Sequence, residues 1–207
     1  MRIPARSILN VGLLLLFLTL LLGFVVSFGW TKSLDVRLLK ALAMREGDTP
    51  AICITVARGL SWLGDAAQRS LIFLVVAAWL VWKKRVRTAL VMIVLPVLAA
   101  VTTDVLKEAF GRARPDVVPH LGVFGNLSYP SGHASNAASI FILVSLILPS
   151  KRPGLQFCMG LAGAALVSLS RLWLGVHWPS DVIGGMMWGA GFAMIALHLV
   201  QTLETGK

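Results

Sequence analysis

Long runs of residues without a charged side chain constrain the fold of this sequence more than any other feature. Six of these runs are also strongly apolar: residues 7–31, 70–82, 88–103, 134–150, 153–170 and 182–202. A helix needs about 20 mostly apolar residues to cross a lipid bilayer. The first run and the last three meet this length directly, and the other two reach it if the helices extend toward Asp65 and past Asp104. We therefore expect an all-α integral membrane bundle of six transmembrane helices.

The composition supports a membrane protein rather than a soluble domain. Of the 207 residues, 57% are hydrophobic and only 14% are charged, whereas a soluble domain is usually about 25% charged. This length suits one compact membrane bundle. We therefore expect residues 1–207 to form a single domain, with a motif-bearing core over residues 100–185. The first apolar run is too long for the apolar part of a signal peptide, so we expect it to remain as a spanning helix.

The net charge of +10 is distributed unevenly along the chain. Lysine and arginine are enriched in the cytoplasmic loops of membrane proteins. With six spans, the basic loop at 83–87, the pair at 151–152 and the basic chain ends, including Arg2 and Lys207, all fall on one side. We expect that side and both termini to be cytoplasmic. Residues 31–65 and the later loops that carry polar motifs then lie outside.

The segment between the first two spans, residues 32–65, combines an amphipathic pattern with turn residues. Leu34, Leu38 and Leu42 share one helical face, while charged residues lie on another. This pattern predicts a short helix that lies on the membrane surface. A second short helix is predicted over residues 55–63. Two interpretations stay open for this outer segment: a lid or entry face for lipid, and a covering loop between spans.

Ionisable residues gather at the predicted outer ends of the later spans. They are Lys107, Arg114, His133, Arg171, His177 and Asp181. His177 and Asp181 are four residues apart, which places them on one face of a helix or of a helical turn. Arginine binds phosphate oxygens in bidentate fashion, and lysine binds them as a point charge. Three cations with two histidines therefore predict an oxyanion-binding site.

The spacing of these residues matches a known pattern. Lys107-x6-Arg114-Pro115 is followed by Pro130-Ser131-Gly132-His133 and then by Ser170-Arg171-x5-His177-x3-Asp181. This ordered set resembles the tripartite signature of the type 2 phosphatidic acid phosphatase superfamily, and every defining position is occupied. The six predicted spans, with the motifs on one side, also resemble the membrane branch of that family.

The resemblance implies a role for each motif residue. His177 would attack phosphorus to form a phosphohistidine, and Asp181 would fix the tautomer of its ring. His133 would protonate the leaving oxygen and later activate water. The phosphate would be bound by Lys107, Arg114 and Arg171, by backbone N–H groups of Ser131 and Gly132 at a helix start, and by the Ser131 hydroxyl. No metal or other cofactor is expected, because three cations already supply the charge.

The expected function is metal-independent hydrolysis of a lipid phosphate or pyrophosphate at the outer membrane face. Substrates in this family include undecaprenyl pyrophosphate, phosphatidylglycerophosphate, phosphatidic acid and lipid A phosphates. The expected partners are the lipid phosphate substrate and membrane lipids, with no nucleic acid, and the location is the inner membrane of a bacterium. Two alternatives stay open: a phosphotransferase, for example one that acts on lipid A, and a non-catalytic lipid-binding or transport protein. A vanadium haloperoxidase shares related motifs, but that branch is soluble.

Several other residues fit no motif position. Arg112 is expected to solvate a loop or to contact lipid head groups. Asp104 lies one helical turn before Lys107. It is expected to position that lysine, and the alternative is that it simply ends the apolar stretch. Cys53 and Cys158 are expected to fill apolar space without forming a disulfide.

Overall fold

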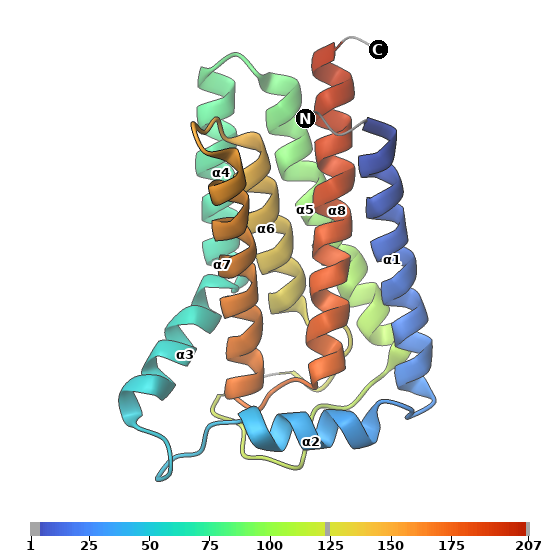
Figure 1. The fold of residues 1–207 in the computed structure, drawn as a ribbon, viewed down its shortest axis with the longest axis vertical. Coiled ribbons are helices and arrows are strands. Elements are labelled where there is room, and N and C mark those ends of the chain that lie inside the picture. The colour runs from blue at the N-terminus through green and yellow to red at the C-terminus, as the bar shows by residue number, and fades with distance from the viewer. Residues whose placement is uncertain (1–4, 123–124, 206–207) are drawn as a thin grey trace.

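The computed structural model describes residues 5–122 and 125–205, and within them the regular structure is helical apart from one isolated β-bridge. The helices are α1 (Ala5–Ser27), α2 (Lys32–Leu42), α3 (Ala51–Leu63), α4 (Ala66–Trp82), α5 (Val86–Phe110), α6 (Gly132–Ile147), α7 (Pro153–Trp173) and α8 (Pro179–Thr205). In Figure 1, α2 lies across one end of the bundle and α3 slants away from the long helices. The all-α prediction is confirmed.

The structure contains fewer clear membrane spans than the sequence predicts. Four helices, α1, α5, α7 and α8, are long and apolar enough to cross a membrane. Helices α3 and α4 pass that test only as a pair, and the pair is bent by 53°. Helix α6 has 16 residues, or about 24 Å at 1.5 Å per residue, against a hydrocarbon core of about 30 Å. The chain is therefore an integral membrane protein with four or five long spans among its described residues, and the count of six remains a prediction.

Helix α6 is short, and each of its residues is buried or half-buried in the bundle. It contacts α4, α5, α7 and α8, so little of it needs to match the thickness of lipid. A Cβ atom on Gly185 would lie 2.3 Å from the Ser131 carbonyl oxygen, and one on Gly189 would lie 2.0 Å from the Ser135 carbonyl oxygen. The two glycines of α8 therefore allow a close approach to α6, as small residues do in membrane bundles. This packing brings the first turns of α6 and α8 together.

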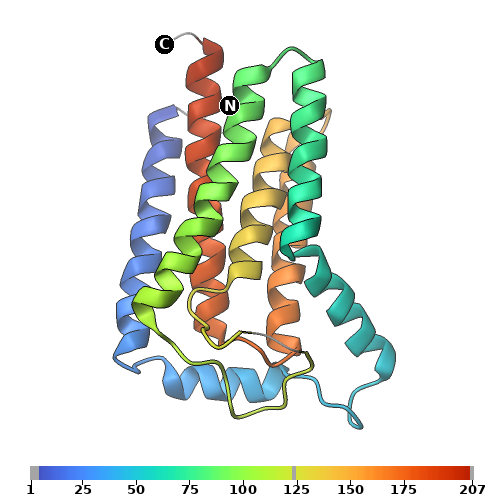
Figure 2. The same cartoon turned by 180° about the vertical axis from the view of Figure 1, so that it is seen from behind.

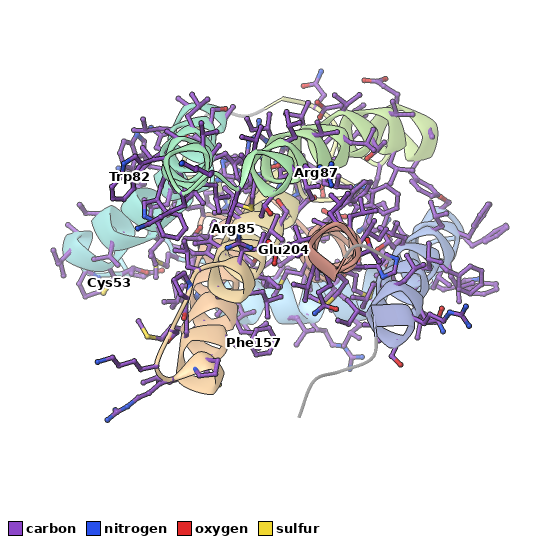
Figure 3. The ribbon with its side chains drawn as sticks, turned by 90° about the horizontal axis from the view of Figure 1, so that it is seen from above. Cys53, Trp82, Arg85, Arg87, Phe157 and Glu204 are labelled. Atoms are coloured by element: carbon purple, nitrogen blue, oxygen red, sulfur yellow. The ribbon has the colours of Figure 1, made fainter. Side chains whose placement is uncertain are left out.

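The two ends of the bundle differ in character. The start of α1, the end of α8 and the α4–α5 and α6–α7 turns lie at one end, and α2 lies with the remaining loops at the other (Figures 1 and 2). At the first end, Arg85 donates hydrogen bonds to Glu204 and so ties the α4–α5 turn to α8. Figure 3 shows this end from above, with the two side chains next to each other. Arg2 and Lys207, which contribute to the charge pattern, lie outside the described residues.

The outer segment forms both of its predicted short helices. The amphipathic pattern corresponds to α2, and the helix predicted over residues 55–63 begins earlier, at Ala51. Asp35 and Leu39 are the buried residues of α2. A buried carboxylate on a helix predicted to lie on the membrane surface is unexpected, and its partners lie in the site described next.

Candidate active site

The predicted site residues lie at the end of the bundle that α2 crosses. Each is found at or near a helix terminus: Lys107 at the end of α5, Ser131 before α6, Gly132 and His133 at its start, Arg171 at the end of α7, His177 in the α7–α8 turn and Asp181 in the first turn of α8. Arg114 is not on α5, since that helix ends at Phe110 and Gly111 follows with a φ of 56°. A loop, rather than a further helical turn, therefore carries Arg114.

The loop between α5 and α6 is held against the α7–α8 turn. Ala113 and Leu127 form an isolated antiparallel bridge within the loop, and Leu121 donates a backbone hydrogen bond to the Leu174 carbonyl at 3.0 Å. Figure 2 shows the loop passing beneath the bundle on its way to α6. A Cβ atom on Gly175 would lie 2.6 Å from the Pro119 carbonyl oxygen, so this close contact requires glycine.

His177 has a defined ring orientation within this turn. Its side chain is 1% exposed, and its Nε2 atom lies 3.2 Å from Arg114 Nη1. A guanidinium group can only donate hydrogen bonds, so Nε2 carries the lone pair and Nδ1 carries the proton. The Nδ1 atom lies 3.4 Å from Asp181 Oδ2 and 3.3 Å from the Ser128 hydroxyl. The predicted pairing of His177 with Asp181 is therefore present in the structure.

The surroundings of His177 keep its ring neutral. Burial lowers the pKa of His177 well below the usual 6.5, and the charges of Arg114, Arg171, Lys107 and His133 lower that pKa further. Coulomb interactions weaken with distance, so these four groups lie in the same region of the molecule as the ring. The three predicted phosphate-binding cations and both histidines thus share one site, and His177 presents a neutral nitrogen lone pair to it.

Arg114 is fixed beside His177 by backbone carbonyl groups. Its Nη1 atom donates to the Val176 carbonyl at 2.6 Å, and its Nε atom donates to the Gly125 carbonyl. Burial lowers the pKa of Arg114, while the charge of Asp181 opposes that shift. A guanidinium held in this way needs little further ordering to bind an anion.

His133 has a carboxylate partner that the sequence did not suggest. Its Nε2 atom lies 2.7 Å from Asp65 Oδ1, and Asp65 lies at the break between α3 and α4. A Cβ atom on Gly64 would lie 3.0 Å from His133 Cδ2. The absence of a side chain at Gly64 thus lets the break pack directly against the His133 ring.

Arg171 and Lys107 complete the cationic part of the site. Arg171 is fully buried, and its Nη1 atom donates to the Ser61 hydroxyl on α3. Lys107 Nζ lies 3.8 Å from Asp104 Oδ1, so Asp104 contacts the lysine as predicted. A Cβ atom on Gly132 would lie 3.4 Å from Lys107 Nζ, which places the ammonium group at the start of α6.

Ser131 departs in part from its predicted role. Its backbone N–H group donates to the Asp181 carbonyl at 3.0 Å, so that donor is already used and does not face a ligand. Its hydroxyl is buried and has no hydrogen-bond partner among residues 5–122 and 125–205. Only the hydroxyl, and not the N–H group, therefore remains a candidate donor to phosphate.

The prediction for Arg112 is wrong. Its side chain is only 14% exposed, and it bridges two acidic groups instead of facing solvent or lipid. The Nη1 atom contacts Asp181 Oδ1, and the Nη2 atom donates to Asp35 Oδ2 at 2.7 Å. Sequence spacing could not reveal this bridge, because Asp35 and Asp181 are separated by most of the chain. The one available signal was an acidic residue on the otherwise basic helix α2.

Asp181 accepts further hydrogen bonds from nearby residues. The backbone N–H group of Trp178 donates to Oδ2 at 2.8 Å, and the Ser128 hydroxyl donates to the same atom. Ser128 and Arg112 are joined by a backbone hydrogen bond of 2.8 Å. The α5–α6 loop thus delivers two side chains to one carboxylate, which fixes the orientation of that carboxylate toward His177.

An open groove of about 310 Å³ lies next to these residues. Its lining is Asp104, Lys107, Glu108, Arg114, Gly125, Asn126 and Leu127. Because two of the site's cations line this groove, it offers a route by which a phosphate group could reach them.

A membrane-embedded helical bundle with a cluster of cations around a buried histidine is the class that the fold and the site define. Residues 85–204 match the PAP2 superfamily model. That match covers more than half of the chain, and the chain belongs to this superfamily. The match begins just before α5, so α1 to α4 lie before the matched region.

Three curated relatives from different organisms illustrate the similarity. The lipid A 1-phosphatase of Rhizobium johnstonii is 32% identical over 108 residues, which is 48% of this chain and 42% of that protein. Phosphatidylglycerophosphatase B of Bacillus subtilis is 31% identical over 140 residues, covering 65% of this chain and 68% of the relative. The undecaprenyl-diphosphatase of Sulfolobus acidocaldarius is 32% identical over 133 residues, covering 62% and 63%. The chain thus spans less than half the length of the lipid A 1-phosphatase.

Two solved structures share the fold. The crystal structure of a transmembrane PAP2-type phosphatidylglycerolphosphate phosphatase from Bacillus subtilis has a TM-score of 0.82 at 26% identity, and covers 94% of this chain and 96% of that one. The Aquifex aeolicus LpxE structure has a TM-score of 0.64 at 21% identity, covering 79% and 94%. The second comparison shows the fold alone.

Proposed function

We propose that this protein hydrolyses a lipid phosphate or pyrophosphate through a phosphohistidine formed on His177. The observation that carries this proposal is the ring orientation of His177. Its neutral Nε2 faces Arg114 in a cluster of cations, and its Nδ1–H faces Asp181. A nucleophile directed toward fixed cations attacks a phosphoryl group whose oxygens those cations bind.

The reaction would proceed in two displacements. In the first, Arg114, Lys107 and Arg171 bind the phosphoryl oxygens, and the N–H group of Arg114 moves from Nε2 to an oxygen. The Nε2 lone pair then forms the N–P bond as the P–O bond to the lipid breaks, and His133 gives a proton to the leaving oxygen. Asp181 stabilises the positive charge that develops on the imidazole ring.

The second displacement returns the enzyme to its starting state. His133, now deprotonated, takes a proton from a water molecule whose oxygen attacks phosphorus. The N–P bond breaks, inorganic phosphate leaves, and His177 is again neutral with its proton on Nδ1. We propose that no metal is needed, because three cations already balance the charge on the phosphoryl oxygens. Retained turnover in excess EDTA is the expected result.

The names of the relatives support a lipid phosphate as substrate. They include a lipid A 1-phosphatase, phosphatidylglycerophosphatase B, an undecaprenyl-diphosphatase and a decaprenylphosphoryl-5-phosphoribose phosphatase. All of these names describe a phosphate carried by a lipid or a polyprenol. Undecaprenyl pyrophosphate and phosphatidylglycerophosphate are the substrates we propose first.

The proposed topology has six passes, with the α3–α4 pair and the short central helix α6 each counted as one pass. The basic α4–α5 and α6–α7 turns would then lie in the cytoplasm, and the site would face the outside of a bacterial inner membrane. A reporter fused after Arg87 should be cytoplasmic, and one inserted after Asp116 should be external. The reverse result would move the site to the cytoplasmic face.

The experiment that tests the function is phosphate release from a panel of lipid phosphates by the purified protein. The wild type should release phosphate from at least one member without an added acceptor, which would also argue against a phosphotransferase. His177→Ala should be inactive, whereas the matched control His198→Ala, on α8 outside the site, should keep wild-type turnover. Equal activity of His177→Ala and wild type would overturn the mechanism.

A further inference from the structure

A buried bridge of ions connects α2 to the proposed catalytic pair. Asp35 on α2 is 2% exposed, and its Oδ2 atom accepts a hydrogen bond of 2.7 Å from Arg112 Nη2. The Nη1 atom of the same guanidinium contacts Asp181 Oδ1. Arg112 also lies over the Trp178 ring, with its Cζ atom 5.4 Å from the ring centroid. One arginine thus lies between a carboxylate of the outer segment and the carboxylate that faces His177.

Asp35 also binds the N-terminus of α8. Its Oδ1 atom accepts the Ser180 N–H group at 2.9 Å, and its Oδ2 atom accepts the Ser180 hydroxyl at 2.6 Å. Ser180 is the second residue of α8, where the N–H groups have no partner within the helix and a carboxylate is favoured. Helix α2 therefore supplies the cap for the helical turn that carries Asp181, from a position about 145 residues earlier in the chain.

The charges of Asp35 and Arg112 determine how strongly the Asp181 carboxylate interacts with the His177 ring. Arg112 has one positive charge and two carboxylate partners. If Asp35 were neutral, Arg112 would interact with Asp181 alone and would offset more of its charge. If Arg112 were neutral, two buried carboxylates would lie close together without a cation, which disfavours their ionised forms. Both residues are therefore needed for a fully charged, correctly oriented Asp181.

We propose that Asp35 and Arg112 are positioning residues, which keep Asp181 ionised and directed at His177 Nδ1. This inference rests on the proposed role of His177 and Asp181. It gives α2 the role of positioning a residue of the active site, rather than the role of a mobile lid. The region that matches the PAP2 model is residues 85–204. Asp35 lies outside it, so the motif pattern does not include the residue that we propose positions Asp181.

Two single substitutions should lower the pKa of His177 for different reasons. Asp35→Asn keeps the shape of the side chain but removes its negative charge, so that Arg112 offsets more of the Asp181 charge. Arg112→Gln leaves two buried carboxylates without a cation, which disfavours the ionised form of Asp181. General damage to the fold would instead expose the His177 ring and raise its pKa toward the usual 6.5. Glu46→Gln is the matched control, because it removes a carboxylate from the same outer segment. The side chain of Glu46 is 71% exposed and pairs with Arg58.

The pKa and tautomer of His177 can be measured without turnover, by NMR of the protein labelled with ¹⁵N-histidine in detergent micelles. The His177 signals are assigned from their loss in His177→Ala. We expect the Nδ1–H tautomer in the wild type, a reduced share of it in Asp35→Asn, and wild-type signals in Glu46→Gln. Unchanged His177 signals in both Asp35→Asn and Arg112→Gln would overturn the inference, and so would a rise in the pKa of His177 in either variant.

Turnover supplies a second, independent readout. Loss of a hydrogen bond to a charged group corresponds to about 10- to 100-fold in rate. Asp35→Asn should therefore lower kcat by about 10-fold with little change in KM, because Asp35 is buried behind Arg112 and is not one of the proposed phosphate-binding residues. In a double-mutant cycle, the losses from Asp35→Asn and Arg112→Gln should be clearly non-additive. Additive losses, or a change confined to KM, would contradict a positioning role.

The inference and the proposed function fail in different ways. If the wild type cleaves no lipid phosphate but the NMR shifts are as described, the proposed function fails and the bridge stands. If the wild type cleaves lipid phosphate while Asp35→Asn equals Glu46→Gln in turnover and in NMR signals, the bridge fails and the proposed function stands.

Discussion

The two histidines of the site lie in different surroundings. The side chain of His177 is 1% exposed. Its ring contacts Asp181, which pairs with Arg112, and Arg112 in turn pairs with Asp35. The side chain of His133 is 22% exposed, and its carboxylate partner, Asp65, is 48% exposed. His177 is therefore buried and held by several groups, whereas His133 is partly exposed and has one half-exposed carboxylate partner.

This difference matches the two chemical roles. A nucleophile benefits from a dry site with fixed charges, because such a site costs little reorganisation during the reaction. A general acid that later takes a proton from water must be accessible to water. The comparison therefore supports the proposal that His177 attacks phosphorus and that His133 transfers protons. It also predicts that substitutions around His177 are more harmful than matched ones around His133.

Asp181→Asn should cause the largest loss among the partner substitutions. The amide cannot stabilise a positive His177 ring and can select the wrong tautomer, and the same change in a Ser-His-Asp triad costs about 10⁴-fold. Phosphate release at saturating substrate measures the effect. Near wild-type turnover would show that the buried side of His177 has no role in catalysis.

His133→Ala should lower kcat by about 10²- to 10⁴-fold, the range for loss of a general acid or base. The loss in the first displacement should be smaller for a substrate whose leaving group needs no proton, such as an aryl phosphate. A series of substrates with leaving groups of increasing acidity measures this trend. If the loss is independent of the leaving group, His133 is not the general acid.

Asp65→Asn should have a smaller effect than Asp181→Asn, about 10-fold in kcat, because Asp65 is half exposed and water can partly replace it. Glu46→Gln again serves as the control in the same outer segment. Measurement of both aspartate variants in one assay tests the comparison directly. A larger loss for Asp65→Asn than for Asp181→Asn would reverse the assignment of the two histidines.

The dependence on pH should give the smallest effect. The folded-state pKa of His177 is lowered from 6.5, so the unfolded chain binds a proton at this position more readily than the folded one. The contribution of neutral His177 to stability is therefore fully present above pH 6.5 and declines as the pH falls below it. The melting temperature should fall less steeply below pH 6.5 in His177→Gln than in the wild type. Identical pH profiles would show that His177 is not buried in its neutral form.

The sequence could predict those parts of the molecule that depend on local patterns. The apolar runs predicted the long helices. The spacing of the motifs predicted that His177, Asp181 and the three cations share one site. The length of α6 was harder to interpret, because a central helix is not required to match the bilayer. Arg112 and Asp35 were missed because their roles depend on contacts between distant segments, which no spacing along the chain reveals.

The outer segment makes the same point. Its amphipathic pattern predicted α2 and could not distinguish a lid from a covering loop. In the structure, three residues of the outer segment form hydrogen bonds with residues of the site. Asp35 pairs with Arg112, Ser61 with Arg171 and Asp65 with His133. These three residues precede the region matched by the superfamily model, so they had to be found from geometry.

The most direct test of the central claim is to trap the covalent intermediate. The purified protein is mixed with a radiolabelled lipid phosphate that it cleaves, quenched in base within milliseconds, and digested for mass spectrometry. The account predicts base-stable label on the peptide that contains His177, and no label in His177→Ala. Rapid phosphate release by wild type without any labelled peptide, or with the label on another residue, would contradict it.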